Sequence, residues 1–350
     1  MSRSVFSAPA RPTATSSIKS EGHSEGHYDG SVSLPALTTT GASIVEALTG
    51  RPVLLRGINR SGLEYSSPQG AEARITAGEI EYIVNEWRAN VIRLPFNQAW
   101  ALQRPGYDAG PYLDALDFVI QTAARAGAYT LLDLQWLDAV TPRGTLTNGR
   151  MNYVPPLPDT GSIALWRQLA ERYRDEPSVL YDIFNEPHDV LEDDAAPLLG
   201  IDANGRTFPL PSRRVTMAEW QPWATHLINA VRERNPGALI FVSGVDWGYD
   251  LRGFPLTDDT GVVYATHVYS SKGTDWDAAF GDLARTRPVF AAEWGGGDRD
   301  IAWGLELYRY LTALGVGWTA WSWSDDPRLI KAGSLDTTAF GNLVRAALAS

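Results

Sequence analysis

Two short apolar stretches of the chain each end in a glutamate, a residue type that can donate a proton, accept one or act as a nucleophile. Residues 179–188 have the sequence VLYDIFNEPH, and residues 288–297 have the sequence PVFAAEWGGG. The apolar part of each is typical of a buried parallel strand. Pro187 ends the first, because proline has no N–H to donate to a neighbouring strand. We therefore expect Glu186 and Glu293 at the carboxyl ends of two buried strands, where barrels of parallel strands carry out their chemistry.

The spacing of these two glutamates lets them face each other across a barrel. They are roughly 100 positions apart, which leaves room for three strand–helix units of roughly 35 residues each. Glycoside hydrolysis requires such a carboxyl pair, with one group protonated as the acid and the other ionised as nucleophile or base. A polar cap on a strand end is the alternative for one Asn-Glu pair, but the second stretch of the same design argues against it.

The elements that must position this pair alternate along the chain. The first predicted strand ends at residue 59, and the other seven cover 91–95, 129–134, 179–184, 239–242, 262–267, 288–293 and 316–321. Predicted helices cover 76–88, 112–125, 162–174, 216–234, 278–283, 301–314 and 337–348, and capping boxes open the first and fourth of them. Eight strands with intervening helices predict an α/β fold, the (β/α)8 TIM barrel, formed as one catalytic domain by residues 31–350.

Three further segments complete the predicted organisation. Residues 44–48 and 53–55, joined at Thr49-Gly50, predict an N-terminal β-hairpin that plugs the bottom of the barrel. Residues 1–30 are rich in Ser, Pro, Thr, Gly and His, which predicts a flexible tail whose removal leaves activity intact. Residues 189–214 predict a long loop, a lid or cleft wall.

The motifs Asn185-Glu186-Pro187 and Glu293-Trp294-Gly295 resemble glycoside hydrolase family 5, the cellulase family, over roughly residues 40–350. The resemblance implies that Glu186 is the general acid/base and Glu293 the nucleophile of a retaining double displacement. It also implies that Asn185 hydrogen-bonds the 2-hydroxyl group of the sugar.

The same resemblance extends to four further strand-end residues. It implies that Arg93 holds the nucleophile ionised, that Tyr269 hydrogen-bonds it, and that His267 contacts substrate or the acid/base. Trp321 matches the tryptophan that stacks on a sugar ring. Further tryptophans that follow strand ends are candidates for other sugar subsites: Trp136, Trp247 and Trp294. Those within helix patterns are expected to pack in the core: Trp87, Trp166 and Trp220.

One position departs from the family pattern. Where the family has Asp-Leu-His-Trp after the third strand, this chain has Asp133-Leu134-Gln135-Trp136. Glutamine can donate and accept hydrogen bonds but carries no proton near neutral pH. We expect Gln135 to contact substrate, with catalysis retained and the family's usual substrate specificity less certain to transfer.

Composition restricts the partners of the chain. Its 350 residues have a formal net charge of −11 and no basic stripe with interleaved aromatics, which disfavours nucleic acid, and no cysteine for a thiolate site. No apolar run is long enough to span a membrane. The substrate class favours an extracellular location, although residues 1–17 lack the apolar core of a secretory signal, so the sequence does not assign a compartment. We also expect a monomer that binds a β-linked oligo- or polysaccharide.

Several functions remain open at this point. An endo-β-1,4-glucanase is the leading hypothesis, and a β-mannanase, β-mannosidase or other β-glycosidase of the same mechanism is the alternative, because subsite loops decide between them. A non-catalytic carbohydrate-binding barrel predicts the loss of Arg93 or of one glutamate, and all three are present. We expect no metal or organic cofactor, because two carboxylates suffice and the five histidines are scattered without a His-Glu-x-x-His motif.

Overall fold

The computed structural model describes residues 34–65, 74–137, 155–191, 199–201, 207–209 and 212–350. Residues 32–350 form one unit by their internal contacts, and everything below concerns that unit. The tail predicted for residues 1–30 lies outside the described residues. No helix in the described ranges is long and apolar enough to cross a lipid bilayer.

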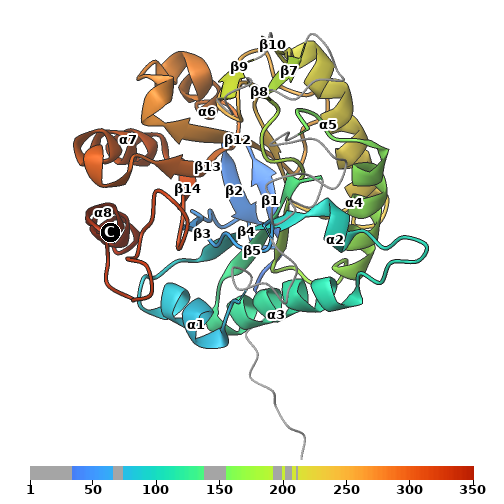
Figure 1. Ribbon diagram of the computed structural model, residues 1–350, viewed down its shortest axis with the longest axis horizontal. Helices are drawn as coiled ribbons and strands as arrows, with labels where there is room; N and C mark the ends of the chain where they lie inside the picture. The colour runs from blue at the N-terminus through green and yellow to red at the C-terminus, as the bar shows by residue number, and fades with distance from the viewer. Residues whose placement is uncertain (1–33, 66–73, 138–154, 192–198, 202–206, 210–211) are drawn as a thin grey trace, which may run out of the picture. The chain divides into compact units, whose positions relative to one another are not determined.

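The predicted barrel is confirmed (Figure 1). Eight parallel strands close in the order β3-β4-β5-β6-β11-β12-β13-β14, so each strand pairs with the next strand of the barrel along the chain and the last pairs with the first. Their bounds are Arg56–Asn59, Val91–Asn97, Tyr129–Trp136, Val179–Asp182, Ile240–Ser243, Val262–Tyr269, Val289–Gly295 and Gly317–Ala320. Because all strands run the same way, their carboxyl ends meet at one rim.

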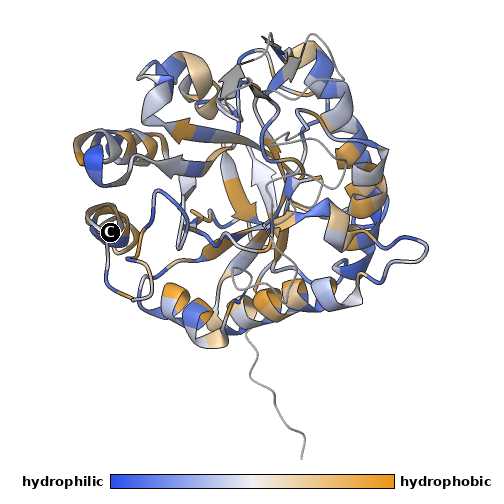
Figure 2. Cartoon of the chain, in the orientation of Figure 1, coloured by the Kyte–Doolittle hydropathy of each residue, from blue (hydrophilic) through white to orange (hydrophobic). Residues whose placement is uncertain are grey.

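Helices surround the barrel (Figure 1), and all of them except the short helix α2, which the sequence did not predict, lie close to their predicted positions. They are α1 Ala77–Asn85, α2 Gln98–Ala101, α3 Gly110–Ala126, α4 Thr160–Arg172, α5 Met217–Arg232, α6 Asp282–Ala284, α7 Ile301–Leu314 and α8 Ala339–Leu348. Short 3-10 helices cover Ser270–Lys272 and Gly297–Arg299, and a π-helical turn, Asp277–Gly281, precedes α6. Figure 2 shows hydrophobic and hydrophilic residues on the same helices, for example α3, as a layer with one buried face requires.

The two predicted capping boxes differ in the structure. At α5 the box is complete, because Thr216 and Glu219 bond reciprocally. At α1 the Thr76 side chain accepts from the Glu79 N–H, but the Glu79 carboxylate pairs with Arg60 instead of returning to the cap. Helix α1 also ends before its predicted limit, where Arg88 adopts a left-handed backbone with φ of 62°. A buried arginine therefore competes for the residue that the sequence pattern assigns to capping.

The N-terminal hairpin exists, but the prediction of its two strands was wrong. The paired strands are β1 (Leu37–Thr40) and β2 (Ser43–Glu46), and they turn at Gly41, where φ is 58°. The predicted turn at Thr49-Gly50 only folds the chain back far enough to form a single bridge from Val45 to Pro52. The hairpin does plug the barrel, because Leu37 and Ile44 pack among interior residues such as Leu131, Phe241 and Ala292.

The described parts of the predicted loop 189–214 contain two small antiparallel pairs. Strand β7 (Asp189–Leu191) pairs with β10 (Ser212–Arg214), and β8 (Leu199–Ile201) pairs with β9 (Thr207–Pro209). These short strands follow β6 and precede α5, so they rise from the carboxyl rim of the barrel.

Two register shifts occur in the barrel, and both lie toward the carboxyl ends of strands. One separates Thr266 from His267 on β12, and the other separates Phe96 from Asn97 on β4. An extra residue in a strand changes the direction in which the following side chains point. The extra residues lie on the partner strands, Ala292 on β13 and Gln135 on β5. The shift at Ala292 therefore sets the direction of the Glu293 side chain that follows it.

Candidate active site

The two glutamates predicted as a pair do meet at the carboxyl rim. Glu293 lies in β13, and Glu186 follows the end of β6. One oxygen of each, together with a ring nitrogen of His267, lie within 4.8 Å of one another. Carboxyl groups about 5 Å apart are typical of retaining glycosidases, whereas a wider pair leaves room for an attacking water.

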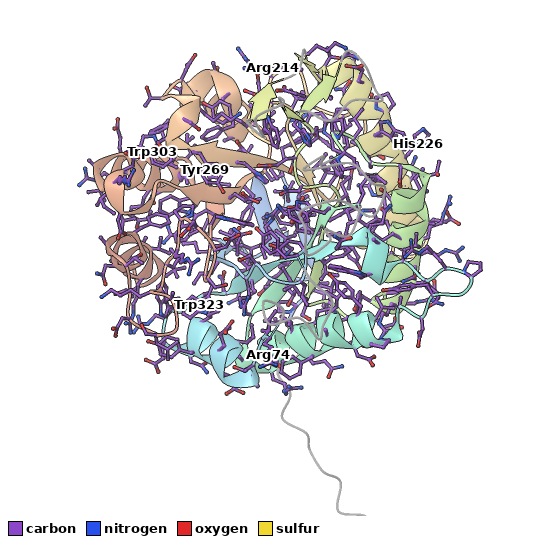
Figure 3. All side chains as sticks on the ribbon, in the orientation of Figure 1. Arg74, Arg214, His226, Tyr269, Trp303 and Trp323 are labelled. Atoms are coloured by element: carbon purple, nitrogen blue, oxygen red, sulfur yellow. The ribbon has the colours of Figure 1, made fainter. Side chains whose placement is uncertain are left out.

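Glu293 is held by two donors from different strands. Arg93 on β4 donates from Nη1 to one oxygen at 2.8 Å, and the Tyr269 hydroxyl donates to the other at 2.6 Å. Tyr269 is the last residue of β12 and is labelled in Figure 3. Glu293 is only 4% exposed, so these two bonds replace most of the hydration of its carboxyl group and stabilise its negative charge.

Arg93 is fully buried and serves as the hub of the site. Its Nε donates to Asp182 at 2.8 Å, and its Nη2 donates to Asn185 at 2.8 Å. Nη1 also reaches the Asn59 amide oxygen at 2.9 Å. A guanidinium presents a rigid planar fork, so these contacts fix its orientation toward Glu293.

The environment of Glu186 favours its protonated form. Burial raises the pKa of its carboxyl to about 7, although 19% of the side-chain surface remains open to the cleft. Nδ1 of His267 lies 2.8 Å from Glu186 Oε1. Burial also lowers the pKa of His267 to about 3, so the imidazole is neutral and this contact is a hydrogen bond rather than an ion pair.

A loop after β11 supports Glu186 and His267 from the side. Trp247 stacks on His188 at 4.0 Å, and Nδ1 of His188 lies 2.6 Å from the Glu186 carbonyl oxygen. A Cβ added to Gly248, where φ is 71°, would lie 2.8 Å from the His267 ring. The His267 ring thus occupies space that only a glycine at position 248 leaves open.

The remaining predicted substrate contacts lie at the rim without bonding either glutamate. Trp136 and Gln135 end β5, and the Tyr65 ring meets Trp136 edge-on at 4.9 Å. Trp321 follows β14, is 7% exposed, and donates from Nε1 to the Asp326 carbonyl at 3.2 Å. Gln135 Oε1 is buried and has no hydrogen-bond partner in the part of the chain that the structure describes.

The interpretation of Trp294 as a sugar subsite was wrong. Its side chain is fully buried and packs edge-on against Trp318 and Phe340, both at 5.4 Å. Successive side chains of a strand point to opposite faces, so Glu293 directed into the barrel requires Trp294 to point outward to the helices. The three helix tryptophans are fully buried as predicted: Trp87, Trp166 and Trp220.

Sequence reasoning missed several residues of the site. Asn59, Asp133 and Asp182 line the buried base of the site around Arg93, and His188 supports Glu186. The signal for the aspartates was present, because each is a charged residue inside an otherwise apolar strand and such a residue must be paired.

Among the described residues, the group best placed to hold a metal ion is Glu186, His267 and Glu293. Arg93 already supplies a fixed positive charge 2.8 Å from one Glu293 oxygen, and Tyr269 occupies the other. A cation at this point would face the repulsion of the guanidinium.

Comparison with known proteins shows the family of the chain. Residues 47–327 match the family model described as cellulase (glycosyl hydrolase family 5). The endoglucanase MaCel5A of Microbulbifer sp. (strain ALW1) is 25% identical over 297 residues, covering 79% of this chain and 49% of the relative. An endoglucanase of Paenibacillus polymyxa is 27% identical over 337 residues, covering 81% of this chain and 78% of the relative.

Solved structures share the fold. The β-glucanase SdGluc5_26A of Saccharophagus degradans superposes with a TM-score of 0.69 at 22% identity, covering 91% of this chain and 95% of that one. The catalytic domain of Thermobifida fusca endoglucanase Cel5A, in complex with cellotetraose, gives a TM-score of 0.64 at 21% identity, covering 90% and 97%. The chain spans about half the length of several curated relatives that it matches.

Proposed function

Because the chain belongs to glycosyl hydrolase family 5, the cellulase family, we propose that it hydrolyses β-glycosidic bonds with retention of configuration. The observation that supports this most directly is the approach of Glu186 and Glu293, whose carboxyl oxygens come within 4.8 Å of each other. That spacing suits a covalent intermediate, because it leaves no room for a water between the nucleophile and the sugar.

In the first step, Glu293 attacks the anomeric carbon while Glu186 protonates the departing oxygen. Arg93 and Tyr269 hydrogen-bond the Glu293 carboxylate and fix its direction, and the burial of Glu186 keeps its proton available near neutral pH. Asn185, fixed by Arg93, is positioned to bond the sugar 2-hydroxyl as the oxocarbenium-like transition state forms.

In the second step, the ionised Glu186 takes a proton from water, and that water releases the sugar from Glu293. His267 accommodates both states of Glu186, because a neutral imidazole nitrogen accepts from the acid or, as the other tautomer, donates to the carboxylate. Two carboxyl groups complete the cycle, so no metal or organic cofactor is required.

A β-1,4-linked glucan is the proposed substrate, cut within the chain. Support comes from relatives that are named endoglucanases and from structural neighbours solved with cellotetraose. Trp136, half-buried at the end of β5, offers a flat apolar surface at the rim for the face of a pyranose ring, and Trp321, 7% exposed after β14, is proposed for the same role. Gln135, in place of the family histidine, is the observation that keeps β-mannan as a second candidate.

Two measurements test the proposal. Product release from soluble cellulose, mixed-linkage β-glucan, β-mannan and aryl β-glycosides should be greatest on a β-glucan, and greater activity on mannan would favour the second candidate. A 2-fluoro glucoside with a good leaving group should label Glu293, as peptide mapping would show. A label elsewhere, or an inverted product by NMR, would contradict the retaining mechanism.

A further inference from the structure

At the base of the site, three buried carboxyl groups surround a single guanidinium. Arg93 lies 2.8 Å from Asp182, 2.8 Å from Glu293 and 3.0 Å from Asp133. The side chains of Arg93 and of both aspartates have no exposed surface. If all three carboxyl groups were ionised, one positive charge would face three negative charges in a region shielded from bulk solvent.

The two aspartates are direct neighbours. Asp133 on β5 and Asp182 on β6 are register partners on adjacent parallel strands. Such strands lie about 4.8 Å apart. Both side chains contact Arg93, so they point to the same interior face of the barrel. Two carboxyl groups in this arrangement repel each other when both are ionised, and one of the two is then favoured to keep a proton.

If both aspartates are ionised, some of their buried oxygens are left without a hydrogen bond, because an ionised carboxylate can only accept. Asp182 accepts from Arg93 through Oδ2, but its Oδ1 has no donor among the described residues. Neither oxygen of Asp133 accepts a hydrogen bond within that part of the chain, although Nη2 of Arg93, which donates to Asn185, lies 3.0 Å from Oδ1. A proton on Asp133 would convert one of three unsatisfied buried acceptors into a donor.

Most of the charged groups around the two aspartates favour a protonated carboxyl group. Arg93 on β4 is the cation that faces it, whereas Glu293 on β13, Glu186 after β6 and Glu64 after β3 are all carboxyl groups. Burial raises the pKa of Asp182 to about 6 and the pKa of Asp133 well above its usual range, and the neighbouring carboxyl groups act in the same sense as burial.

We propose that Asp133 and Asp182 share one proton at neutral pH and act together as a singly charged unit that positions Arg93 against Glu293. Asp133 carries the proton and donates it to the free oxygen of Asp182, because Asp182 already receives the charged bond from Arg93 Nε. Both aspartates are positioning residues, since neither touches the reacting atoms.

The shared proton has a consequence for the reaction. With one negative charge on the pair, Arg93 keeps a net positive potential toward the Glu293 oxygen that it contacts at 2.8 Å. With two negative charges, the pair would offset Arg93 and weaken this interaction with the nucleophile. This consequence rests on the proposed function, but the protonation state of the pair does not.

The protonation state can be measured on the whole protein without substrate. Among the described residues, Asp133 and Asp182 are the only buried aspartates. In protein labelled with ¹³C at the aspartate carboxyl, infrared and NMR spectra at pH 7 should show one protonated aspartic acid, and this signal should vanish in Asp133→Asn. Spectra in which every aspartate is ionised at pH 7 would overturn the proposal, whatever the enzyme's activity.

The pH profile separates a shared proton from two ionised groups. A carboxamide in place of the Asp133 carboxyl would imitate the neutral acid, so Asp133→Asn should leave the acidic limb of kcat/KM in place and kcat within about fivefold of wild type. The double variant Asp133→Asn/Asp182→Asn removes the remaining charge and should move that limb to lower pH. A comparable shift in Asp133→Asn alone would show that Asp133 is ionised. Asp133→Ala, which cannot supply the hydrogen bond, should lose far more activity than Asp133→Asn.

Discussion

The carboxyl group of Glu186 keeps its proton to an unusually high pH because the protein around it excludes water. Catalysis as proposed needs this proton, so kcat/KM should fall as the pH rises through about 7, the pKa of Glu186. His267 is already neutral over that range and adds nothing to this limb. The substitution Glu186→Gln should abolish the limb and should slow substrates with poor leaving groups most. Equal losses for good and poor leaving groups would contradict the acid/base role.

Tyr269 supplies one of the two bonds that hold Glu293, at 2.6 Å. The substitution Tyr269→Phe removes a hydrogen bond to a charged group, so kcat should fall roughly 10- to 100-fold. Tyr264→Phe is the matched control, because Tyr264 lies on the same strand but bonds Leu256 and Asp259 away from the site. Similar losses in both variants would show that the effect comes from strand β12 as a whole.

At this scale the sequence identified the residues that stand at strand ends and missed those that hold them. Glu186, Glu293 and Arg93 could be predicted because polar side chains after apolar runs mark a catalytic rim. Asp182 and Asn59 could not be assigned partners, because their contacts with Arg93 depend on which strands lie side by side in the closed barrel. Trp294 was misassigned because its position after a strand was weighed without the alternation of strand faces.

Among the elements, the loop after β11 is the one whose backbone shape the site depends on most directly. Gly248 has a φ of 71°, and a Cβ there would press on the His267 ring. Gly248→Ala should therefore displace His267 and lower kcat, and it should move the basic limb of the pH profile. Gly253→Ala tests backbone strain alone, because Gly253 has a φ of 72° but nothing within 4 Å of the added carbon. Equal effects of the two substitutions would exclude a role for the His267 contact.

Strand β13 has one catalytic face and one structural face. Trp294 fills the layer between barrel and helices, so Trp294→Ala should reduce the free energy of unfolding by about 3–5 kcal/mol. Trp136→Ala, at the rim, should change stability by less than about 1 kcal/mol and should instead raise KM for oligosaccharides. Chemical denaturation and kinetics on both variants would check this division. A Trp294 variant with wild-type stability and a raised KM would show that Trp294 contributes to a sugar subsite.

The order and type of the elements followed from local patterns, but the pairing of the hairpin did not. Thr49-Gly50 has the composition of a hairpin turn, whereas the turn that joins two paired strands is at Gly41. Both sites offer a glycine between short apolar segments. The difference is that pairing at Gly41 places Leu37 and Ile44 inside the barrel, while Leu48 next to the other turn is 96% exposed. Burial against distant strands therefore decided between two locally similar turns.

For the whole molecule, buried carboxyl groups make stability depend on pH. Burial raises the pKa of Glu64 to about 8, and the pKa values of Glu186 and Asp182 are raised to about 7 and 6. Between about pH 4 and its folded pKa, each of these carboxyl groups is protonated in the folded protein and ionised in the unfolded chain. The free energy of unfolding should therefore fall as pH rises through this window, by up to about 1.4 kcal/mol per pH unit for each group.

Thermal unfolding between pH 5 and pH 9 tests this through one residue. Of the three groups, Glu64 has the widest pH range between its unfolded and folded pKa values, and Glu64→Gln removes this titration. The free energy of unfolding of the variant should therefore increase relative to wild type as the pH rises, up to about pH 8. Glu219→Gln is the control, because hydrogen bonds from Arg213 and Thr216 lower the pKa of Glu219 to about 2, below the range tested. A stability difference between Glu64→Gln and wild type that stays constant with pH would show that Glu64 is ionised in the folded protein.

The hairpin at the base of the barrel also imposes an order in time. Its residues Leu37 and Ile44 are synthesised before the barrel strands, yet they pack against Phe241, Val263 and Ala292, which follow more than 190 positions later. Contacts between such distant parts of a chain form slowly, because a long segment must be ordered to bring them together. During synthesis on a ribosome, the apolar face of the hairpin would stay exposed to solvent until most of the barrel strands had emerged. A segment made before all eight barrel strands is thus among the last to pack, and it closes the base of the barrel only after the strands that line the interior have been synthesised.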